Sequence, residues 1–332
     1  ITIVLLLWFG SREMLSGTAN VGEVVAIVNY ATRITSALSV FSFIIMVFSR
    51  AKASASRINE VLHTQADMTD VKAETESAQM QGKISFEHVS FQYPNQERWA
   101  LKNVSFSLEA GETLAILGST GSGKTTLIHL MPRLLDTVGG EVVIEGRNVK
   151  EWKQHVLRGK IGIVPQEPLL FTGTIKENLL WGNRQASDEE IMEACKHAQI
   201  YKSITALPDK FDTMIGQKGV NLSGGQRQRL TIARALIRKP KILLFDDSTS
   251  ALDSKTEKQL LQDLTGYNST KIFITQKIST ALYADRIILM EHGEKVAEGT
   301  HSELSKHSAL YQAILKSQLE EGSERHAVET TK

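Results

Sequence analysis

A glycine-rich loop between an apolar run and a helical run carries the clearest chemical signal in the sequence. Gly118 is followed, after four residues, by Gly123, Lys124 and Thr125, which is the phosphate-binding pattern G-x-x-x-x-G-K-[ST]. Glycines let the backbone curl so that successive N–H groups point at phosphate oxygens, and the following helix presents its positive end to them. Lys124 would reach the outer phosphates and Thr125 would ligate Mg²⁺. We assign phosphate binding to the whole loop and the start of its helix: Gly118, Ser119, Thr120, Gly121, Ser122, Gly123, Lys124, Thr125 and Thr126.

Two adjacent aspartates could supply the acidic groups that such a loop needs. Asp246 and Asp247 follow the apolar run 242–245, which predicts a buried strand that delivers carboxylates at its C-terminal end. A phosphate loop that holds Mg²⁺ requires a carboxylate from a neighbouring strand, and we assign that role to Asp246. Asp247 stands where an ATP-hydrolysing enzyme would place the group that orients the attacking water.

The elements that position these residues are predicted from apolar periodicity. Alternating patterns at 83–94, 101–109 and 112–118 predict strands, and helical stretches and apolar strands alternate from there to about residue 319. This pattern is typical of an α/β domain with a largely parallel sheet. The segments SDEEI (187–191) and HSEL (301–304) are predicted to be capping boxes that start helices.

The first sixty residues differ in kind from the rest. Residues 1–10 are apolar and predict the end of a helix, and the largely apolar stretch 24–48 is long enough to cross a bilayer. The basic residues that follow it, Arg50, Lys52 and Arg57, indicate the cytoplasmic side. A soluble core hairpin is the alternative. Arg33, inside this stretch, either lines a polar pathway or reaches back to the outer interface.

Composition limits which partners, disulfides and metal sites the sequence can have. With 38 Lys plus Arg against 37 Asp plus Glu the net charge is +1, so no charge excess favours a nucleic-acid partner. The single Cys195 cannot form an internal disulfide and is expected to be a small buried residue on a helix. His63, His88, His129 and His155 lack ligand spacing and are expected at the surface or on strands. A length of 332 residues and an initial Ile suggest a fragment of a longer protein with at least two parts.

The segment LSGGQRQRLTIARAL (222–236), upstream of the aspartate strand, resembles the signature of ABC transporter nucleotide-binding domains. The preceding spans and linker are similar to the half-transporter layout of ABC exporters, and the resemblance covers nearly the whole chain. It implies the end of an all-α transmembrane domain (1–60), a linker (61–82), an α/β P-loop NTPase domain with a helical subdomain (83–319) and a polar tail (320–332).

The resemblance also implies roles for further residues. Tyr93 matches the aromatic residue on which adenine stacks. Gln166 matches the glutamine that contacts Mg²⁺ or water and couples the ATP site to the membrane domain. In a head-to-tail dimer the signature would grip the γ-phosphate held by the opposite subunit, through Ser223, Gly224, Gly225 and Gln226. Residues 250–253 match the loop that crosses the dimer interface, and 212–220 matches an exporter loop only loosely.

Two residues depart from the family pattern. Active members carry Glu where this chain has Asp247, and His where it has Gln276, which can hydrogen-bond phosphate but cannot carry an imidazolium charge. A carboxylate displaced by about 1 Å can lose roughly 100-fold in rate. With Lys124, Thr125, Asp246 and Gln166 retained, these departures suggest a site that binds ATP and Mg²⁺ and hydrolyses ATP slowly.

The resemblance therefore implies the degenerate-site subunit of a heterodimeric exporter of small amphipathic molecules. Such a protein would lie in the plasma membrane as a multi-pass protein, with its nucleotide-binding domain in the cytoplasm and a second half-transporter as its partner. A homodimeric exporter with weak ATPase activity and an ATP-gated, channel-like protein are the alternatives.

Overall fold

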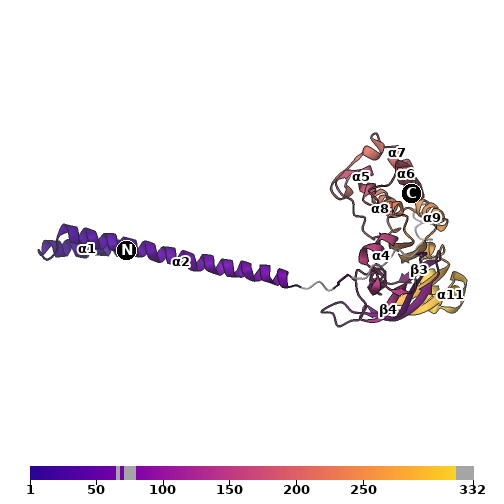
Figure 1. Cartoon of the computed structure of the whole chain (residues 1–332), viewed down its shortest axis with the longest axis horizontal. Helices are drawn as coiled ribbons and strands as arrows, with labels where there is room; N and C mark the ends of the chain where they lie inside the picture. Colours follow the sequence, from indigo (N-terminus) through magenta and orange to yellow (C-terminus); the bar gives the residue numbers. More distant parts are fainter. Residues whose placement is uncertain (65–67, 71–79, 319–332) are drawn as a thin grey trace. The chain divides into compact units, whose positions relative to one another are not determined.

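The computed structural model describes residues 1–64, 68–70 and 80–318, and its two compact units are Ile1–Thr69 and Asp70–Lys332 (Figure 1). The first unit is a helical hairpin of α1 (Thr2–Leu15) and α2 (Val21–His63). Gly10 allows the two helices to approach closely, because a Cβ there would lie 2.6 Å from Cγ1 of Val24. At the start of α2, the carboxylate of Glu23 accepts the N–H of Asn20 at 2.9 Å.

Among the described residues, α2 is the helix whose length and apolar composition allow it to cross a membrane. The predicted span 24–48 lies inside it. Serine and threonine hydroxyls interrupt the apolar surface of the span 24–48, but each donates to the carbonyl oxygen four residues earlier, as in Thr32 to Val28 at 2.8 Å and Ser36 to Thr32 at 2.9 Å. These hydroxyls therefore need no water, which makes the helix compatible with an apolar environment.

The described residues of the second unit form three sheets. The largest has the strand order β12-β11-β3-β10-β9-β6, in which the inner neighbours are parallel and β12 is an antiparallel edge. Its strands are β3 (Thr113–Gly118), β6 (Ile161–Val164), β9 (Ile242–Asp246), β10 (Thr270–Thr275), β11 (Arg286–Glu291) and β12 (Glu294–Gly299).

A second, antiparallel sheet has the order β2-β1-β4-β5, and β7 pairs with β8 in a third. Their strands are β1 (Ile84–Phe91), β2 (Leu101–Leu108), β4 (Gly139–Ile144), β5 (Arg147–Asn148), β7 (Gly173–Thr174) and β8 (Met214–Ile215). The strands predicted at 83–94 and 101–109 are present as β1 and β2, and they lie in this antiparallel sheet rather than in the largely parallel one.

Helices cover these sheets on several sides. The described helices of this unit are α3 (Lys124–Leu130), α4 (Gln154–Lys160), α5 (Ile175–Leu180), α6 (Asp188–His197), α7 (Tyr201–Thr205), α8 (Gly224–Ile237), α9 (Ser254–Thr265), α10 (Ile278–Ala281) and α11 (His301–His307), with short 3-10 turns η1 (Val149–Glu151), η2 (Lys210–Asp212) and η3 (Gln217–Gly219). Residues 309–318 are also helical.

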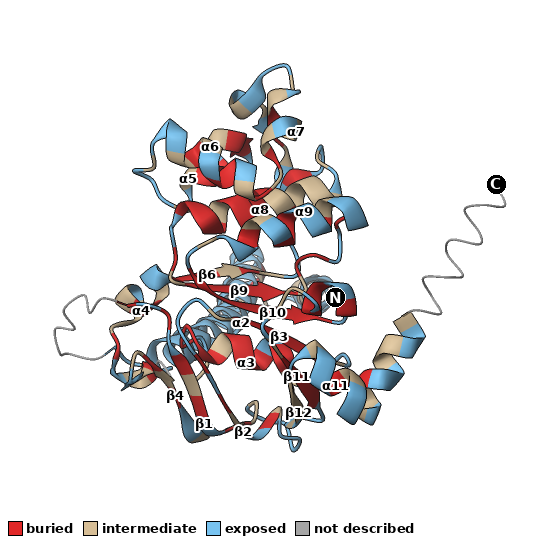
Figure 2. Ribbon diagram, turned by 90° about the vertical axis from the view of Figure 1, so that its right-hand side faces the viewer, coloured by how far each residue is buried: buried red, intermediate tan, exposed pale blue. Residues whose placement is uncertain are grey.

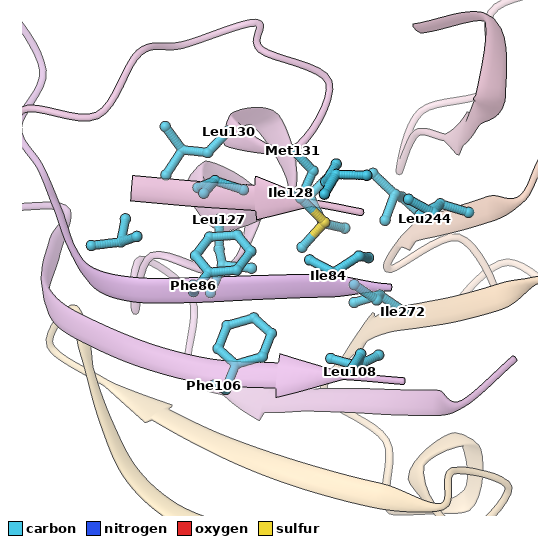
Figure 3. Packing of buried hydrophobic residues seen from close by; sticks show 14 of the residues in the cluster. Ile84, Phe86, Phe106, Leu108, Leu127, Ile128, Leu130, Met131, Leu244 and Ile272 are labelled. Atoms are coloured by element: carbon cyan, nitrogen blue, oxygen red, sulfur yellow. The ribbon is translucent and has the colours of Figure 1, made fainter. Parts of the chain in front are cut away.

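The core around α3 joins the two larger sheets. Leu127, Ile128 and Leu130 of α3 pack between Phe86 of the antiparallel sheet and Leu244 of the parallel sheet (Figure 3). Phe86 and Phe106 stack with ring centroids 4.6 Å apart. This packing fixes the helix that follows the phosphate loop.

A second core lies between the parallel sheet and the helices α5 to α9, which gather on one side of the unit (Figure 2). Cys195 of α6 is buried within it, as predicted, and burial raises the pKa of its thiol to about 12. The predicted capping box at Ser187 starts α6, since Ser187 Oγ accepts from the N–H of Glu190 at 3.3 Å.

The predicted capping box at 301–304 was placed one residue too late. The N-cap of α11 is Thr300, whose Oγ1 accepts from the N–H of Glu303 at 3.3 Å, while the Glu303 carboxylate accepts the N–H of Thr300 at 2.8 Å. The box is therefore Thr300 with Glu303, because these two side chains have the reciprocal spacing that satisfies both N–H groups.

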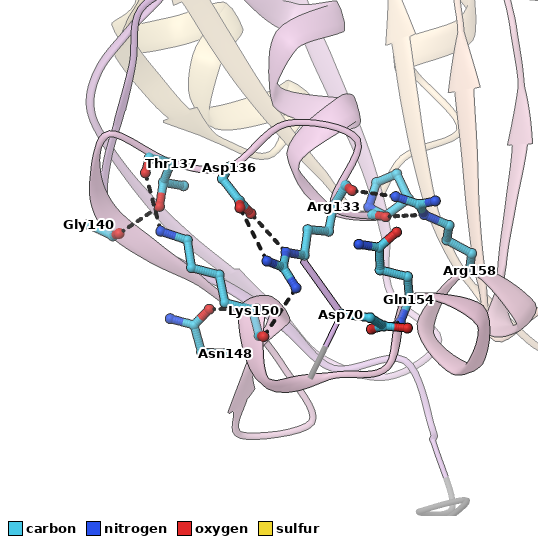
Figure 4. Close-up of polar contacts among 10 residues, drawn as sticks. Asp70, Arg133, Asp136, Thr137, Gly140, Asn148, Lys150, Gln154 and Arg158 are labelled. Carbon is cyan, nitrogen blue, oxygen red and sulfur yellow. Dashed lines mark hydrogen bonds and ion pairs between the residues drawn. The ribbon is translucent and has the colours of Figure 1, made fainter. Parts of the chain in front are cut away.

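A cluster of polar contacts holds residues 132–136, which follow α3, in place (Figure 4). Arg133 is buried, has a φ of 51°, and its guanidinium donates to both carboxylate oxygens of Asp136, at 2.9 and 3.2 Å. Arg158 of α4 donates to the carbonyl oxygens of Pro132 and Arg133 at 3.0 and 2.7 Å. The C-terminal end of α3 is thus fixed from two directions.

Candidate functional site

The phosphate loop connects β3 to α3 at the C-terminal edge of the parallel sheet. A Cβ at Gly118 would lie 2.3 Å from the carbonyl oxygen of Met290, and Gly123 has a φ of 98° with the carbonyl oxygen of Ala100 2.4 Å from its would-be Cβ. Larger residues at these two positions would push the loop off the neighbouring backbone. The two glycines therefore set how deeply the loop sits against the sheet.

Lys124 points across the inside of this loop. Its Nζ donates to the carbonyl oxygens of Gly118 and Ser119, at 2.8 and 2.7 Å, and to Ser122 Oγ at 3.2 Å. Burial lowers the pKa of this ammonium, and the nearby carboxylates of Asp247 and Asp246 oppose that shift. A cation held in this loop is placed to bind the outer phosphates of a nucleotide.

Thr125 and Asp246 come together as the sequence predicted for a metal pair. Thr125 Oγ1 donates to Asp246 Oδ1 at 3.1 Å. Asp246 ends β9, which is separated from β3 by β10 rather than lying next to it. Gln166, which follows β6, lines the same cavity. A hydroxyl, a carboxylate and an amide carbonyl are oxygen donors that suit Mg²⁺, so this set fits that metal.

Asp247 and Gln276 also border this cavity. Asp247 has a φ of 43° and is half-buried, and its N–H donates to the carbonyl oxygen of Ile274 at 2.9 Å. Burial, followed by the negative charge of Asp246, raises the pKa of the Asp247 carboxyl. Gln276 Nε2 lies 3.4 Å from Thr120 Oγ1 of the phosphate loop. Asp247 and Gln276, which follow β9 and β10, therefore both face the phosphate loop.

The cavity has a volume of about 370 Å³. Its lining includes eleven of the predicted site residues: Tyr93, Thr120, Gly121, Gly123, Lys124, Thr125, Thr126, Gln166, Asp246, Asp247 and Gln276. The other three loop residues, Gly118, Ser119 and Ser122, surround the Lys124 ammonium. Tyr93 is anchored by its hydroxyl, which is 3.1 Å from Thr126 Oγ1.

Sequence reasoning missed one wall of the cavity, formed by Gln96, Arg98, Trp99 and Ala100. Arg98 NH2 lies 3.0 Å from His292 Nδ1 in the turn between β11 and β12. The available signal was the position of the Arg-Trp-Ala run directly before β2 and only a few residues after Tyr93.

The signature residues lie elsewhere in this unit. Among the described residues, the cavity lining includes none of Ser223, Gly224, Gly225 and Gln226. They start α8, where Ser223 Oγ accepts from the N–H of Gln226 at 3.2 Å and Gln226 Oε1 accepts the N–H of Ser223 at 2.9 Å. A Cβ at Gly225 would lie 3.3 Å from the carbonyl oxygen of Ala251. The signature therefore packs against the loop after β9.

Comparison with known proteins identifies this arrangement. Residues 101–250 match the family model described as ABC transporter. The uncharacterized ABC transporter ATP-binding protein YfiB of Bacillus subtilis (strain 168) is 56% identical over 323 residues, which are 97% of this chain and 56% of that protein. A putative multidrug export ATP-binding/permease protein of Staphylococcus aureus (strain NCTC 8325 / PS 47) is 43% identical over 70% of this chain and 41% of its own length.

A solved structure of a bacterial Atm1-family ABC exporter with ATP bound is similar to this chain with a TM-score of 0.77 and 32% identity, covering 91% of this chain and 53% of that one. The chain thus spans about half the length of the relatives it matches. Residues 101–250 therefore match the ABC transporter family model, and the chain has the ABC exporter fold, a helical N-terminal region followed by an α/β ABC ATPase domain.

Proposed function

We propose that this chain belongs to a half-transporter whose ATP site binds MgATP firmly and hydrolyses it slowly, and which exports small amphipathic molecules together with a second, different half-transporter. One observation carries this proposal. The same cavity is lined by Lys124, Thr125 and Asp246, which would bind phosphate and Mg²⁺, and by the two departing residues, Asp247 and Gln276.

The chemistry of Asp247 supports slow turnover. A general base must reach the attacking water, and a side chain one methylene shorter than Glu ends farther from it. Gln276 can donate a hydrogen bond to a phosphate oxygen but supplies no positive charge. Binding groups are therefore complete, whereas the groups that orient water and stabilise developing charge are weakened.

The intact signature supports an asymmetric pair. Ser223 and Gly224 lie outside this chain's own cavity, so they are free to complete a second site on a partner subunit. A partner with Glu and His at the two departing positions would form the productive site with this chain's signature. This chain's own site, with ATP retained, would hold the dimer partly closed between cycles.

The first unit supports a membrane location. The apolar exposed surface of α2 fits a lipid bilayer, and the Staphylococcus aureus relative is a putative multidrug export permease. We assign residues 1–60 to the end of the transmembrane domain, 61–82 to the linker, 83–319 to a cytoplasmic nucleotide-binding domain and 320–332 to a polar tail. Nucleic acid is not a proposed partner.

The decisive experiment measures ATP turnover of the complex purified from native membranes, with the partner identified by mass spectrometry. Turnover should stay within about twofold after Asp247→Asn, whereas removing the partner's corresponding acid should lower it by roughly 100-fold or more. If Asp247→Asn alone abolishes turnover, Asp247 is the working base. If the only partner is a second copy of this chain, a homodimeric exporter with weak ATPase activity replaces the asymmetric pair.

A further inference from the structure

The switch segment 276–278 is held by a side chain from the far end of the described chain. Gln318 donates from Nε2 to the carbonyl oxygen of Gln276 at 2.5 Å and accepts at Oε1 from the N–H of Ile278 at 2.9 Å. A carbonyl oxygen can only accept and a backbone N–H can only donate, so this orientation of the amide is the one that satisfies both. Gln318 therefore pairs with the switch on both sides of Lys277.

The helix at residues 309–318, which carries Gln318, is held in place by a hydrophobic cluster. Tyr311 is fully buried in a cluster with Ile278 and Leu289, and Ile314 and Leu315 pack against the same cluster. Gln312, on the same helix, donates to the carbonyl oxygens of Ser305 and Lys306 at 2.8 and 3.3 Å. The helix thus contacts both α11 and the switch, through two different glutamines.

A second anchor holds the switch from the opposite direction. Lys277 Nζ lies 3.1 Å from the Glu257 carboxylate of α9, whose other oxygen accepts from Thr280 Oγ1 at 2.9 Å. With the backbone at 276 and 278 fixed by Gln318 and the side chain at 277 fixed by α9, the side chain of Gln276 has a defined direction. That direction brings Gln276 Nε2 to 3.4 Å from Thr120 Oγ1 of the phosphate loop.

We propose that Gln318 is a positioning residue for recognition of the outermost phosphate of the bound nucleotide, and that it acts through Gln276. The inference rests on the proposed function, since it takes the cavity to be an ATP site. It predicts an effect on the preference of the cavity for ATP over ADP. Gln318 should matter for ATP, which has the outer phosphate, and should not matter for ADP, which lacks it.

The test uses the assembled transporter in membranes and a photoreactive azido analogue of ATP or ADP, read out by labelling of this subunit. Gln318→Ala and the isosteric Gln318→Glu, which loses the donor to the Gln276 carbonyl, should each weaken ATP binding by about tenfold. Binding of ADP should change by less than about twofold. Gln276→Ala should give the same loss as Gln318→Ala, and the double variant should be no worse than either, because both residues act on one contact.

Gln312→Ala is the matched control, since it also removes an amide that makes two hydrogen bonds to backbone, but to α11. It should leave the ratio of ATP to ADP affinity unchanged. Equal losses for ATP and ADP, or losses that add in the double variant, would overturn the role of Gln318 alone. If the unaltered subunit binds neither nucleotide, the proposed function fails together with this inference.

Discussion

At the scale of single residues, the buried carboxylate of Asp246 destabilises the nucleotide-free fold and would be stabilised by a bound cation. Asp246 is 8% exposed at the end of β9, and burial raises the pKa of its carboxyl despite the hydrogen bond from Thr125 and the positive charge of Lys124. A raised pKa means that the folded protein disfavours the charged carboxylate relative to the unfolded chain. A bound Mg²⁺ would reverse this preference.

We therefore predict that Asp246→Asn raises the melting temperature of the nucleotide-free protein at pH 7 by roughly 2–4 °C, while removing the added stability that MgATP confers. The two proteins should converge as the pH falls through the raised pKa toward the ordinary value of 3.8, because Asp246 then becomes neutral. Asp253→Asn is the control of opposite sign, because hydrogen bonds from Thr256 lower the pKa of that carboxyl. A lower melting temperature for Asp246→Asn at pH 7 would contradict the argument.

At the scale of elements, a contact joins α9 to the switch, the segment whose Gln276 lines the candidate nucleotide cavity. Glu257 is 4% exposed and accepts from both Lys277 and Thr280. We predict that Glu257→Ala lowers the free energy of unfolding by about 1–3 kcal/mol, since it leaves a half-buried ammonium and a buried hydroxyl without their acceptor. Glu257→Gln, which keeps an acceptor for Thr280, should cost less.

Hydrogen exchange provides the local measurement for this prediction. The amides of 276–281 should exchange faster in Glu257→Ala, whereas the antiparallel sheet should be unaffected. Glu294→Ala, which removes a surface pair with Lys102 at 3.4 Å, is the matched control and should change stability little. Equal effects of the two alanine variants would show that the contact between α9 and the switch stabilises the fold no more than a surface ion pair does.

The same scale shows what the sequence could and could not predict. The phosphate loop, the strand that ends at Asp246 and the capping box at Ser187 are local patterns, in which residue spacing alone defines the geometry. The assignment of β1 and β2 to a separate antiparallel sheet depends on the pairing of β1 with β2 on one side and with β4 on the other, and β4 begins more than thirty residues later along the chain. The contact of Gln318 with the switch joins residues that are 42 apart along the chain, and it likewise has no local signal.

At the scale of the whole molecule, open space beside the first residue of the signature helix separates effects inside this chain from effects on a partner. Gly224 is the first residue of α8, and a Cβ built on it meets nothing within 4 Å. Its backbone has an ordinary helical conformation, so a side chain there strains nothing in this chain. Any loss of function after such a substitution must arise where another molecule approaches.

We predict that Gly224→Asp in this chain lowers ATP turnover of the assembled transporter by roughly 100-fold, because a carboxylate at the start of α8 would repel the phosphates of a nucleotide held by the partner subunit. Labelling of this chain's own cavity by an azido analogue of ATP should be unchanged. Gly159→Asp is the matched control, since that glycine also has open space around it, on α4. If Gly224→Asp weakens labelling of its own chain and leaves turnover intact, the signature serves this chain's own site and the head-to-tail arrangement is wrong.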